Sequence, residues 1–254
     1  MPEVLVYIFI HCLNRYYDFY TLFKYNVIQY CCMQFSGEEL TFRRVFSYIF
    51  GLYLITLGVA FSIKSGLGSA PVSSIPYAMN LIGNIEIGIA TFIFHSILVA
   101  IELILLRKDF KRKHFLQVFV GVLFGAFTSF SVSLMYFIPP AYNLFLAFVM
   151  SAISILLIAL GLFFYVPANI IPLSVEGVTQ AIAIVTNKPF STIKVCFDVC
   201  VVSTALILSY VFLGEFGSVG IGTILGALFI GTTVKFIHKL NLHLTGNNVD
   251  LKKM

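Results

Sequence analysis

Six separate stretches of predominantly apolar residues constrain the fold of this chain more than any other feature. A bilayer core about 30 Å thick is crossed by roughly 20 apolar helical residues, so each stretch predicts a membrane-spanning α-helix. The predicted spans are Val45–Ile63, Ile87–Leu106, Phe115–Ile138, Asn143–Val166, Phe190–Leu213 and Val219–Ile237.

The composition agrees with a helical membrane protein. Of the 254 residues, 59% are hydrophobic and 11% are charged, whereas soluble domains are about 45–50% apolar and about 25% charged. So little charge cannot cover a water-facing surface, which excludes a soluble enzyme, a disordered chain and a nucleic-acid-binding module. The expected partner is the lipid bilayer, and no nucleic acid is expected. The net charge of +5 indicates basic loops on the cytoplasmic side.

Two further apolar segments, 71–83 and 172–187, are too short to cross. Thirteen helical residues reach only about 20 Å. Both segments begin at a proline and carry small polar side chains, which are Ser73, Ser74, Ser174, Thr179 and Gln180. We therefore expect two half-length helices that enter the membrane or lie at its interface.

The basic loops predict which side these segments face. Arg43 and Arg44 precede the first span, and five Lys or Arg residues occupy positions 107–113. Short basic loops belong on the cytoplasmic side, and both loops can do so only if segment 71–83 does not cross fully. The prediction is an all-α polytopic protein with six spans, two half-length helices on opposite sides, and both termini in the cytoplasm.

The two ends of the chain are set apart from the spans. Residues 1–42 form an N-terminal extension, and residues 239–254 form a cytoplasmic tail. Residues 1–32 are rich in Tyr, Asn, Ile and Phe, show no helical periodicity and contain no cleavable signal peptide. Our hypothesis is that Met33 is the natural start. The alternative is an aromatic segment that lies on the membrane surface.

The spans contain an internal repeat. The segment 54–61 (LITLGVAF) matches 157–164 (LIALGLFF) at an offset of 103, and Pro71 and Pro172 follow at an offset of 101. Repeat 1 is expected over 43–138 and repeat 2 over 139–238. Each holds three spans and a half-helix, so the second enters the membrane inverted. This 3+3 plan is common in secondary transporters, although a duplication can also give only a symmetric bundle.

Two Gly-xxx-Gly pairs occupy equivalent positions in the two repeats. They are Gly121 with Gly125, and Gly222 with Gly226. Small residues four apart allow helix backbones in lipid to approach closely. We expect these glycines to be packing sites where the two halves meet.

Ionisable residues within spans are costly and are therefore candidates for function. Lys194 and Asp198 lie four residues apart on the fifth span and can pair, either as a gated ion pair or proton relay or as a structural salt bridge. Glu176 lies near the start of the second half-helix, where the helix dipole favours a carboxylate. His95 is the counterpart of Asp198 and suits either a proton shuttle or an interhelical hydrogen bond.

Other polar and aromatic residues are expected near the membrane surface. Glu102 lies near a span end, and Tyr165 is one of the tyrosines expected in the interfacial belt. No Ser-His-Asp order, HExxH motif or acidic metal cluster occurs. We therefore expect no enzyme activity, no metal and no cofactor.

Several of these motifs resemble the bacterial YczE/YitT-type integral membrane proteins, most closely the YczE-like group. The similar segments are 43–83, with Arg43-Arg44 and Leu67-Gly-Ser-Ala-Pro71, then Pro172-Leu-Ser-Val-Glu-Gly177, Lys194 with Asp198, and Val219-Gly-Ile-Gly-Thr-Ile-Leu-Gly226. The resemblance implies a small multi-pass protein of the bacterial cytoplasmic membrane. It implies no particular activity.

The leading hypothesis is a small secondary transporter or exporter of a small solute or ion, with its site between the half-helices. The site would comprise Glu176, Lys194, Asp198, His95, Ser73, Ser74, Thr179 and Gln180. Two alternatives are a substrate-capturing membrane subunit of a larger transporter and a non-transporting scaffold or assembly factor. The sequence leaves open whether the chain forms a homo-oligomer.

Overall fold

A computed structural model describes residues 41–107, 110 and 112–245, which form eight α-helices. The hypothesis on Met33 and most of the tail fall outside these residues. Six helices are long and apolar enough to cross a membrane, as predicted. They are α2 (Phe42–Ser65), α4 (Ile87–Leu106), α5 (Leu116–Leu134), α6 (Leu144–Ala168), α8 (Phe190–Leu213) and α9 (Ile221–Thr245).

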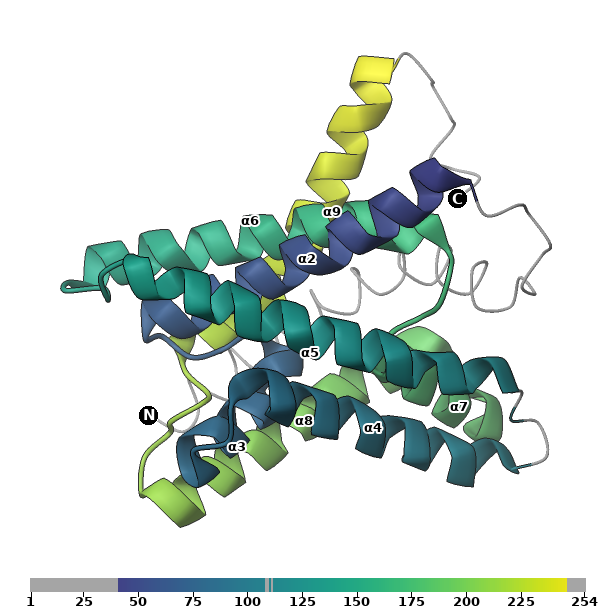
Figure 1. Ribbon diagram of the computed structural model, residues 1–254, viewed down its shortest axis with the longest axis horizontal. Coiled ribbons are helices and arrows are strands. Elements are labelled where there is room, and N and C mark those ends of the chain that lie inside the picture. The colour runs from purple at the N-terminus through teal and green to yellow at the C-terminus, as the bar shows by residue number, and fades with distance from the viewer. Residues whose placement is uncertain (1–40, 108–109, 111, 246–254) are drawn as a thin grey trace.

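The remaining two helices are the short ones expected from the sequence. The first is α3 (Ser74–Gly83), which follows a 3-10 turn η1 (Pro71–Ser73), and the second is α7 (Ser174–Thr186). Each packs between the same two spans: α3 lies against α8 and α4, and α7 lies against α4 and α8. Figure 1 shows both short helices on the side of the molecule that α4 and α8 occupy.

Several helices end at a residue in the left-handed conformation. Gly66 (φ 72°) ends α2, Asn84 (φ 50°) ends α3, Asn169 (φ 46°) ends α6 and Asn187 (φ 53°) ends α7. Glycine and asparagine adopt this conformation at the least cost. The equivalent ends, 66 with 169 and 84 with 187, are each 103 positions apart, which is the offset of the sequence repeat.

The fourth span ends differently from the prediction. The predicted span Asn143–Val166 stops before Pro167, but α6 continues through this proline to Ala168, with Asn169 as its C-cap. Proline stops a helix chiefly by removing one backbone hydrogen bond. Here it stands in the last turn, so only the final residues depend on that bond. The predicted bounds of α4 and α8 agree with the structure.

The most extensive helix contact joins α2 to α6 through glycines. A Cβ atom at Gly161 would lie 2.6 Å from Ile55 Cγ1, and one at Gly58 would lie 2.6 Å from Ile158 Cγ1. Glycine therefore lets the two backbones approach, and each helix places its glycine against an isoleucine of the other. Because 161 follows 58, and 158 follows 55, by 103 positions, the two contacts are reciprocal.

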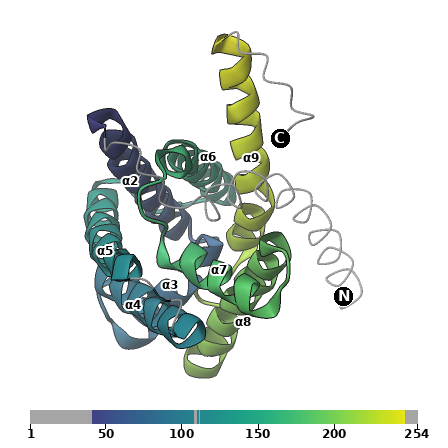
Figure 2. The same cartoon turned by 90° about the vertical axis from the view of Figure 1, so that its right-hand side faces the viewer.

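The helices form two groups. Around the α2–α6 pair, α5 packs against α2 and α9 packs against α6, while α3, α4, α7 and α8 form the second group. Figure 2 shows this second group below the α2–α6 pair. Helix α5 contacts both α2 and α4 and so bridges the groups. The C-terminal part of α9 projects away from the other helices (Figure 1).

A backbone contact joins the loop after α2 to the start of α9. The Gly222 N–H donates to the Leu67 carbonyl (2.7 Å), and the Ser69 N–H donates to the Ser218 carbonyl (3.0 Å). Gly68 between them has φ 102°, and a Cβ there would lie 2.4 Å from the Gly220 nitrogen. Only glycine suits both the backbone conformation and the close approach.

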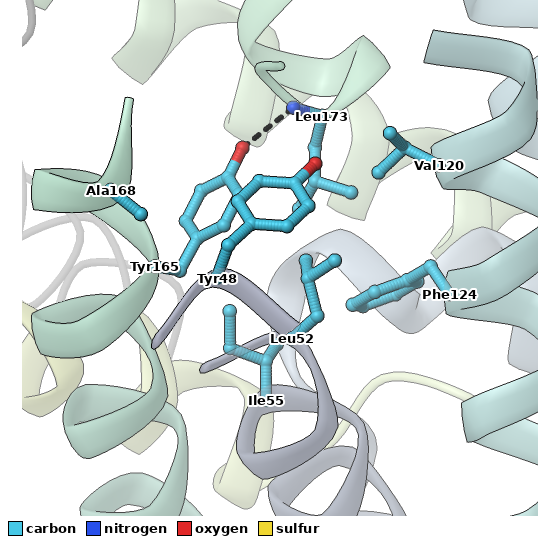
Figure 3. Close-up of a cluster of buried hydrophobic side chains, with 8 residues drawn as sticks. All are labelled: Tyr48, Leu52, Ile55, Val120, Phe124, Tyr165, Ala168 and Leu173. Atoms are coloured by element: carbon cyan, nitrogen blue, oxygen red, sulfur yellow. Dashed lines mark hydrogen bonds between the residues drawn. The ribbon is translucent and has the colours of Figure 1, made fainter. Parts of the chain in front are cut away.

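At the opposite end, an apolar cluster joins α2, α5 and α6. Figure 3 shows Tyr48 and Leu52 of α2 facing Phe124 of α5 and Tyr165 of α6. The start of α2, the start of α5 and the end of α6 therefore lie at one end of the bundle. Since α5 follows α4 after a short loop, the basic residues in the first turn of α2 and after α4 share that end.

The glycine contact leads to a testable prediction. We expect Gly161→Ala to lower the free energy of unfolding by about 1–3 kcal/mol, because the added methyl group would overlap the α2 backbone and Ile55. Thermal unfolding in detergent micelles measures the effect. Gly226→Ala is the control, since its Cβ would lie no closer than 3.4 Å to a neighbour. Equal stability of the two variants would contradict the packing argument.

Candidate functional site

The start of α7 lies beside the middle of α4. A hydrogen bond of 2.6 Å joins Ser174 Oγ, in the first residue of α7, to Nδ1 of His95. His95 is buried and stands near the midpoint of the 20-residue helix α4. The chain reaches α7 in an extended conformation at Leu173 (φ −62°, ψ 150°). The helix α7 therefore begins level with the middle of α4 and not at one end of the bundle. Its first backbone N–H groups, which have no partners within the helix, are located there.

Glu176 stands in the first turn of α7, between α6 and α8. The Tyr165 hydroxyl of α6 donates to Glu176 Oε2 at 3.4 Å and accepts the Leu173 N–H at 2.7 Å. The charges of Lys194 and Asp198 on α8 act on the Glu176 carboxylate. The fold thus gathers side chains from three helices around the beginning of the half-helix.

Lys194 and Asp198 form the ion pair that their spacing predicts. The Nζ of Lys194 donates to Oδ1 of Asp198 at 2.5 Å, and each residue is 6% exposed. Removing two charges from water is costly, and their mutual attraction offsets that cost only when they remain together.

Two tyrosines at this site were not anticipated from the sequence: Tyr165 was misplaced and Tyr48 was overlooked. Tyr165 was expected at the membrane interface, but the structure buries it against Tyr48, with ring centroids 5.4 Å apart. The Tyr48 hydroxyl donates to the Ile171 carbonyl at 2.8 Å. Tyr48 was missed. Its position three residues before Gly51, a glycine on the α6-facing side of α2, is the available signal that it faces inward.

The other predicted polar residues do not gather between the half-helices. Ser74 Oγ donates to the Pro71 carbonyl (2.7 Å) and Thr179 Oγ1 to the Val175 carbonyl (2.6 Å), so each bonds its own turn. Ser73 is buried in η1. Gln180 lies one turn beyond Glu176, and its Oε1 atom is buried without a hydrogen-bond partner among the described residues.

The half-helices meet through apolar side chains. One cluster contains Val72 of η1 and Ile75 of α3 together with Val175 and Val178 of α7, packed between α4 and α8. The sequence placed the polar site between the two half-helices. The structure instead places the charged side chains around α7, on its side toward α6 and α8.

The predicted packing glycines behave in two ways. Gly222 and Gly226 face Leu67 and Pro71 of the other half, as expected. A Cβ at Gly125 would lie 2.6 Å from the Gly88 carbonyl oxygen, and Gly121 faces His95, so this pair packs against α4 within its own half. The expectation that both pairs join the halves is therefore wrong for Gly121 and Gly125.

The sequence also misplaced Glu102. It was expected at the interface, yet its side chain is buried and accepts a hydrogen bond from His114 Nδ1 at 2.6 Å. Proximity to a helix end does not expose a side chain when other helices cover that end. Within the described residues, no group of three or more His, Cys, Asp or Glu side chains could hold a metal ion.

These features define a multi-pass helical protein with buried ionisable side chains around a half-helix. The chain belongs to a family of unknown function, DUF6198, whose model matches residues 42–239. No curated protein and no solved structure matches the chain. The resemblance to the YczE/YitT-type proteins stays a prediction.

The ion pair on α8 makes a first prediction for the site. We expect Lys194→Met to lower the free energy of unfolding by about 3–5 kcal/mol, because Asp198 would remain buried without the lysine. The double variant Lys194→Met/Asp198→Leu should recover part of that loss. Unfolding in detergent measures both, with the exposed Lys188→Met as control. A double variant less stable than the single variant would contradict this account.

The tyrosine at the entry to α7 makes a second prediction. Tyr165→Phe leaves the buried Leu173 N–H without its acceptor, at a cost of about 1–3 kcal/mol. We expect faster hydrogen exchange at residues 171–176. Tyr48→Phe is the matched control, because it removes a donor to a carbonyl and leaves the Leu173 N–H bonded. Unchanged exchange in Tyr165→Phe would show that the hydroxyl does not hold this segment.

Proposed function

We propose that this protein is a small secondary transporter with its solute site at the start of α7. The observation that carries the proposal is the convergence of Glu176, Lys194 and Asp198 around a half-helix that begins beside the middle of α4. Ionisable side chains at such depth are costly and mark ion or solute pathways. Half-helices that begin at mid-depth are a recurrent means by which transporters bind solutes.

We also propose that the two halves are an inverted repeat. Three observations support it: the spacing of 103 between equivalent helix ends, the reciprocal glycine contacts of α2 and α6, and the exchange in which α3 packs on α8 while α7 packs on α4. Three spans in each half would turn the second half over. Such halves, related by a pseudo-two-fold axis in the membrane plane, can exchange conformations around one site.

The moving parts would be the two helix groups. Glycine contacts lock α2 to α6, whereas the second group of α3, α4, α7 and α8 meets this pair at the tyrosines and Glu176. Rocking of one group against the other would open the start of α7 to either side. Glu176 at this boundary can respond to solute binding, because Tyr165, which donates to it, and Lys194, whose charge acts on it, belong to different groups.

The basic end of the bundle would face the cytoplasm. The start of α2, with Arg43, and the end of α4, with Arg107, lie at the same end. The excess of Lys and Arg in cytoplasmic loops then orients the protein. Both chain termini would lie on that side of a bacterial cytoplasmic membrane.

Sided cysteine labelling tests the proposal without knowledge of the solute. In a background with the five native cysteines changed to serine, we expect Gln180→Cys to react with a membrane-impermeant maleimide from both sides. Inside-out and right-side-out vesicles provide the two sides. A transporter alternates and exposes the site to each side in turn, whereas a scaffold or a capturing subunit exposes it to one side at most.

Two loop positions control for sidedness. Phe110→Cys, between α4 and α5, should react only from the cytoplasmic side, and the exposed Tyr142→Cys, between α5 and α6, only from the other. Labelling of Gln180→Cys from a single side, with both controls correct, would overturn the transporter proposal. Reversal of the two controls would overturn the orientation alone.

A further inference from the structure

A second buried polar cluster lies where α4, α5 and α7 meet. Glu102 of α4 accepts from His114 Nδ1 at 2.6 Å, and Gln117 Nε2 of α5 donates to the same carboxylate oxygen, Oε1, at 3.5 Å. His114 stands in the 3-10 turn η3 (Arg112–Phe115). The facing residue of α7 is Gly177, the neighbour of Glu176.

Two oxygen atoms in this cluster have no donor. Among the described residues, Glu102 Oε2 and Gln117 Oε1 are buried without a hydrogen-bond partner. A Cβ atom at Gly177 would lie 2.7 Å from each of them, so the two oxygens are separated by no more than twice that distance. A buried acceptor without a donor costs about 1–3 kcal/mol. A proton on Glu102 would turn one of these two acceptors into a donor.

His114 connects this cluster to water. Its side chain is 26% exposed, whereas that of Glu102 is 1% exposed. Imidazole exchanges protons readily near neutral pH and acts as a shuttle between water and buried groups. The buried carboxylate therefore has a partly exposed proton carrier in direct contact with it.

We propose that Glu102 and Gln117 form a proton-binding site, which is loaded through His114. A hydronium ion protonates the imidazole, and the imidazolium passes a proton to the carboxylate. The proton arrives on Oε1, the oxygen that His114 contacts, and a half-turn of the carboxylic acid group then places the hydroxyl beside Gln117 Oε1, to which it donates. The carboxylate becomes a neutral carboxylic acid, the imidazole returns to its neutral form, and water is the by-product. Release reverses these steps.

Among the side chains that the structure describes, few other charges surround Glu102. From α5 and η3 it is faced by Gln117 and His114, and from α7 by Gly177, because Glu176 turns toward Tyr165 and α8. Helix α3 adjoins the opposite end of α4, and Tyr77 is its titratable side chain. Arg107, one turn beyond Glu102, is exposed. His114 is thus the titratable group that bears directly on the carboxylate.

The proton site touches the same turn of α7 as the solute site. Gly177 contacts Glu102 and Gln117, while Glu176, one residue earlier, contacts Tyr165. A change of charge and hydrogen bonding at Glu102 therefore acts on the helix that carries Glu176. We infer that this proton is the coupling ion of transport, a step that rests on the proposed function. The binding of the proton does not rest on it.

Infrared difference spectroscopy of the full chain in lipid nanodiscs tests the site. Between alkaline and acidic buffer, we expect a carbonyl-stretch band of a protonated carboxylic acid that is lost in Glu102→Gln. The band should move to higher frequency in Gln117→Leu, because the acid loses its acceptor. Glu86→Gln, an exposed carboxylate at the start of the same helix, is the control and should retain the Glu102 band.

Each alternative outcome has a definite meaning. A band that persists in Glu102→Gln would overturn the site. A band unmoved in Gln117→Leu would overturn it as well, because a bridging water would then satisfy the two oxygens. If Glu102→Gln does not fold, Gln117→Leu still decides. In the same cysteine-free background, with Glu102 unchanged, a ratio of Gln180→Cys labelling from the two sides that does not vary with pH would overturn the coupling and leave the transporter proposal standing.

Discussion

The close approach of α2 and α6 is the contact on which the rest of the fold depends. Lipid tails are as apolar as leucine, so helices in a membrane associate through van der Waals packing and hydrogen bonds. Gly58 and Gly161 bring the two backbones together, and α5 and α9 then lie on either side of the pair. The same approach sets Tyr48 beside Tyr165, which holds the chain where it enters α7.

Many buried polar side chains in this fold form hydrogen bonds within their own stretch of helix, so the few atoms left without a partner point to a functional region. Ser74 and Thr179 bond the carbonyls of their own turns, and Lys194 is bonded to Asp198. The exceptions among the described side chains, on Glu102, Gln117 and Gln180, all lie on or against α7. A buried acceptor without a hydrogen-bond donor costs free energy in a low-dielectric interior. Because these acceptors gather around α7, that helix is the strongest candidate for a functional role.

Features that depend on local sequence were predicted well, whereas the contacts between helices were not. Apolar length predicted the bounds of α4 and α8 and the presence of the two half-helices, and the four-residue spacing predicted the Lys194–Asp198 pair. Glu102 was misplaced because its burial comes from α5 and α7. Gly121 and Gly125 show the same limit, since a Gly-xxx-Gly pair predicts close packing but does not name the partner helix.

The sequence alone determined the class of protein, because hydrocarbon thickness fixes how many apolar residues a span needs and charge is too scarce for any other solvent. It also predicted a repeat, whose offset of 103 matches the spacing of the helix ends. The tertiary structure alone decided that the charged residues surround α7 and that Glu102 meets His114 and Gln117. Such contacts depend on the rotation and depth of each helix, which packing against its neighbours sets and composition does not.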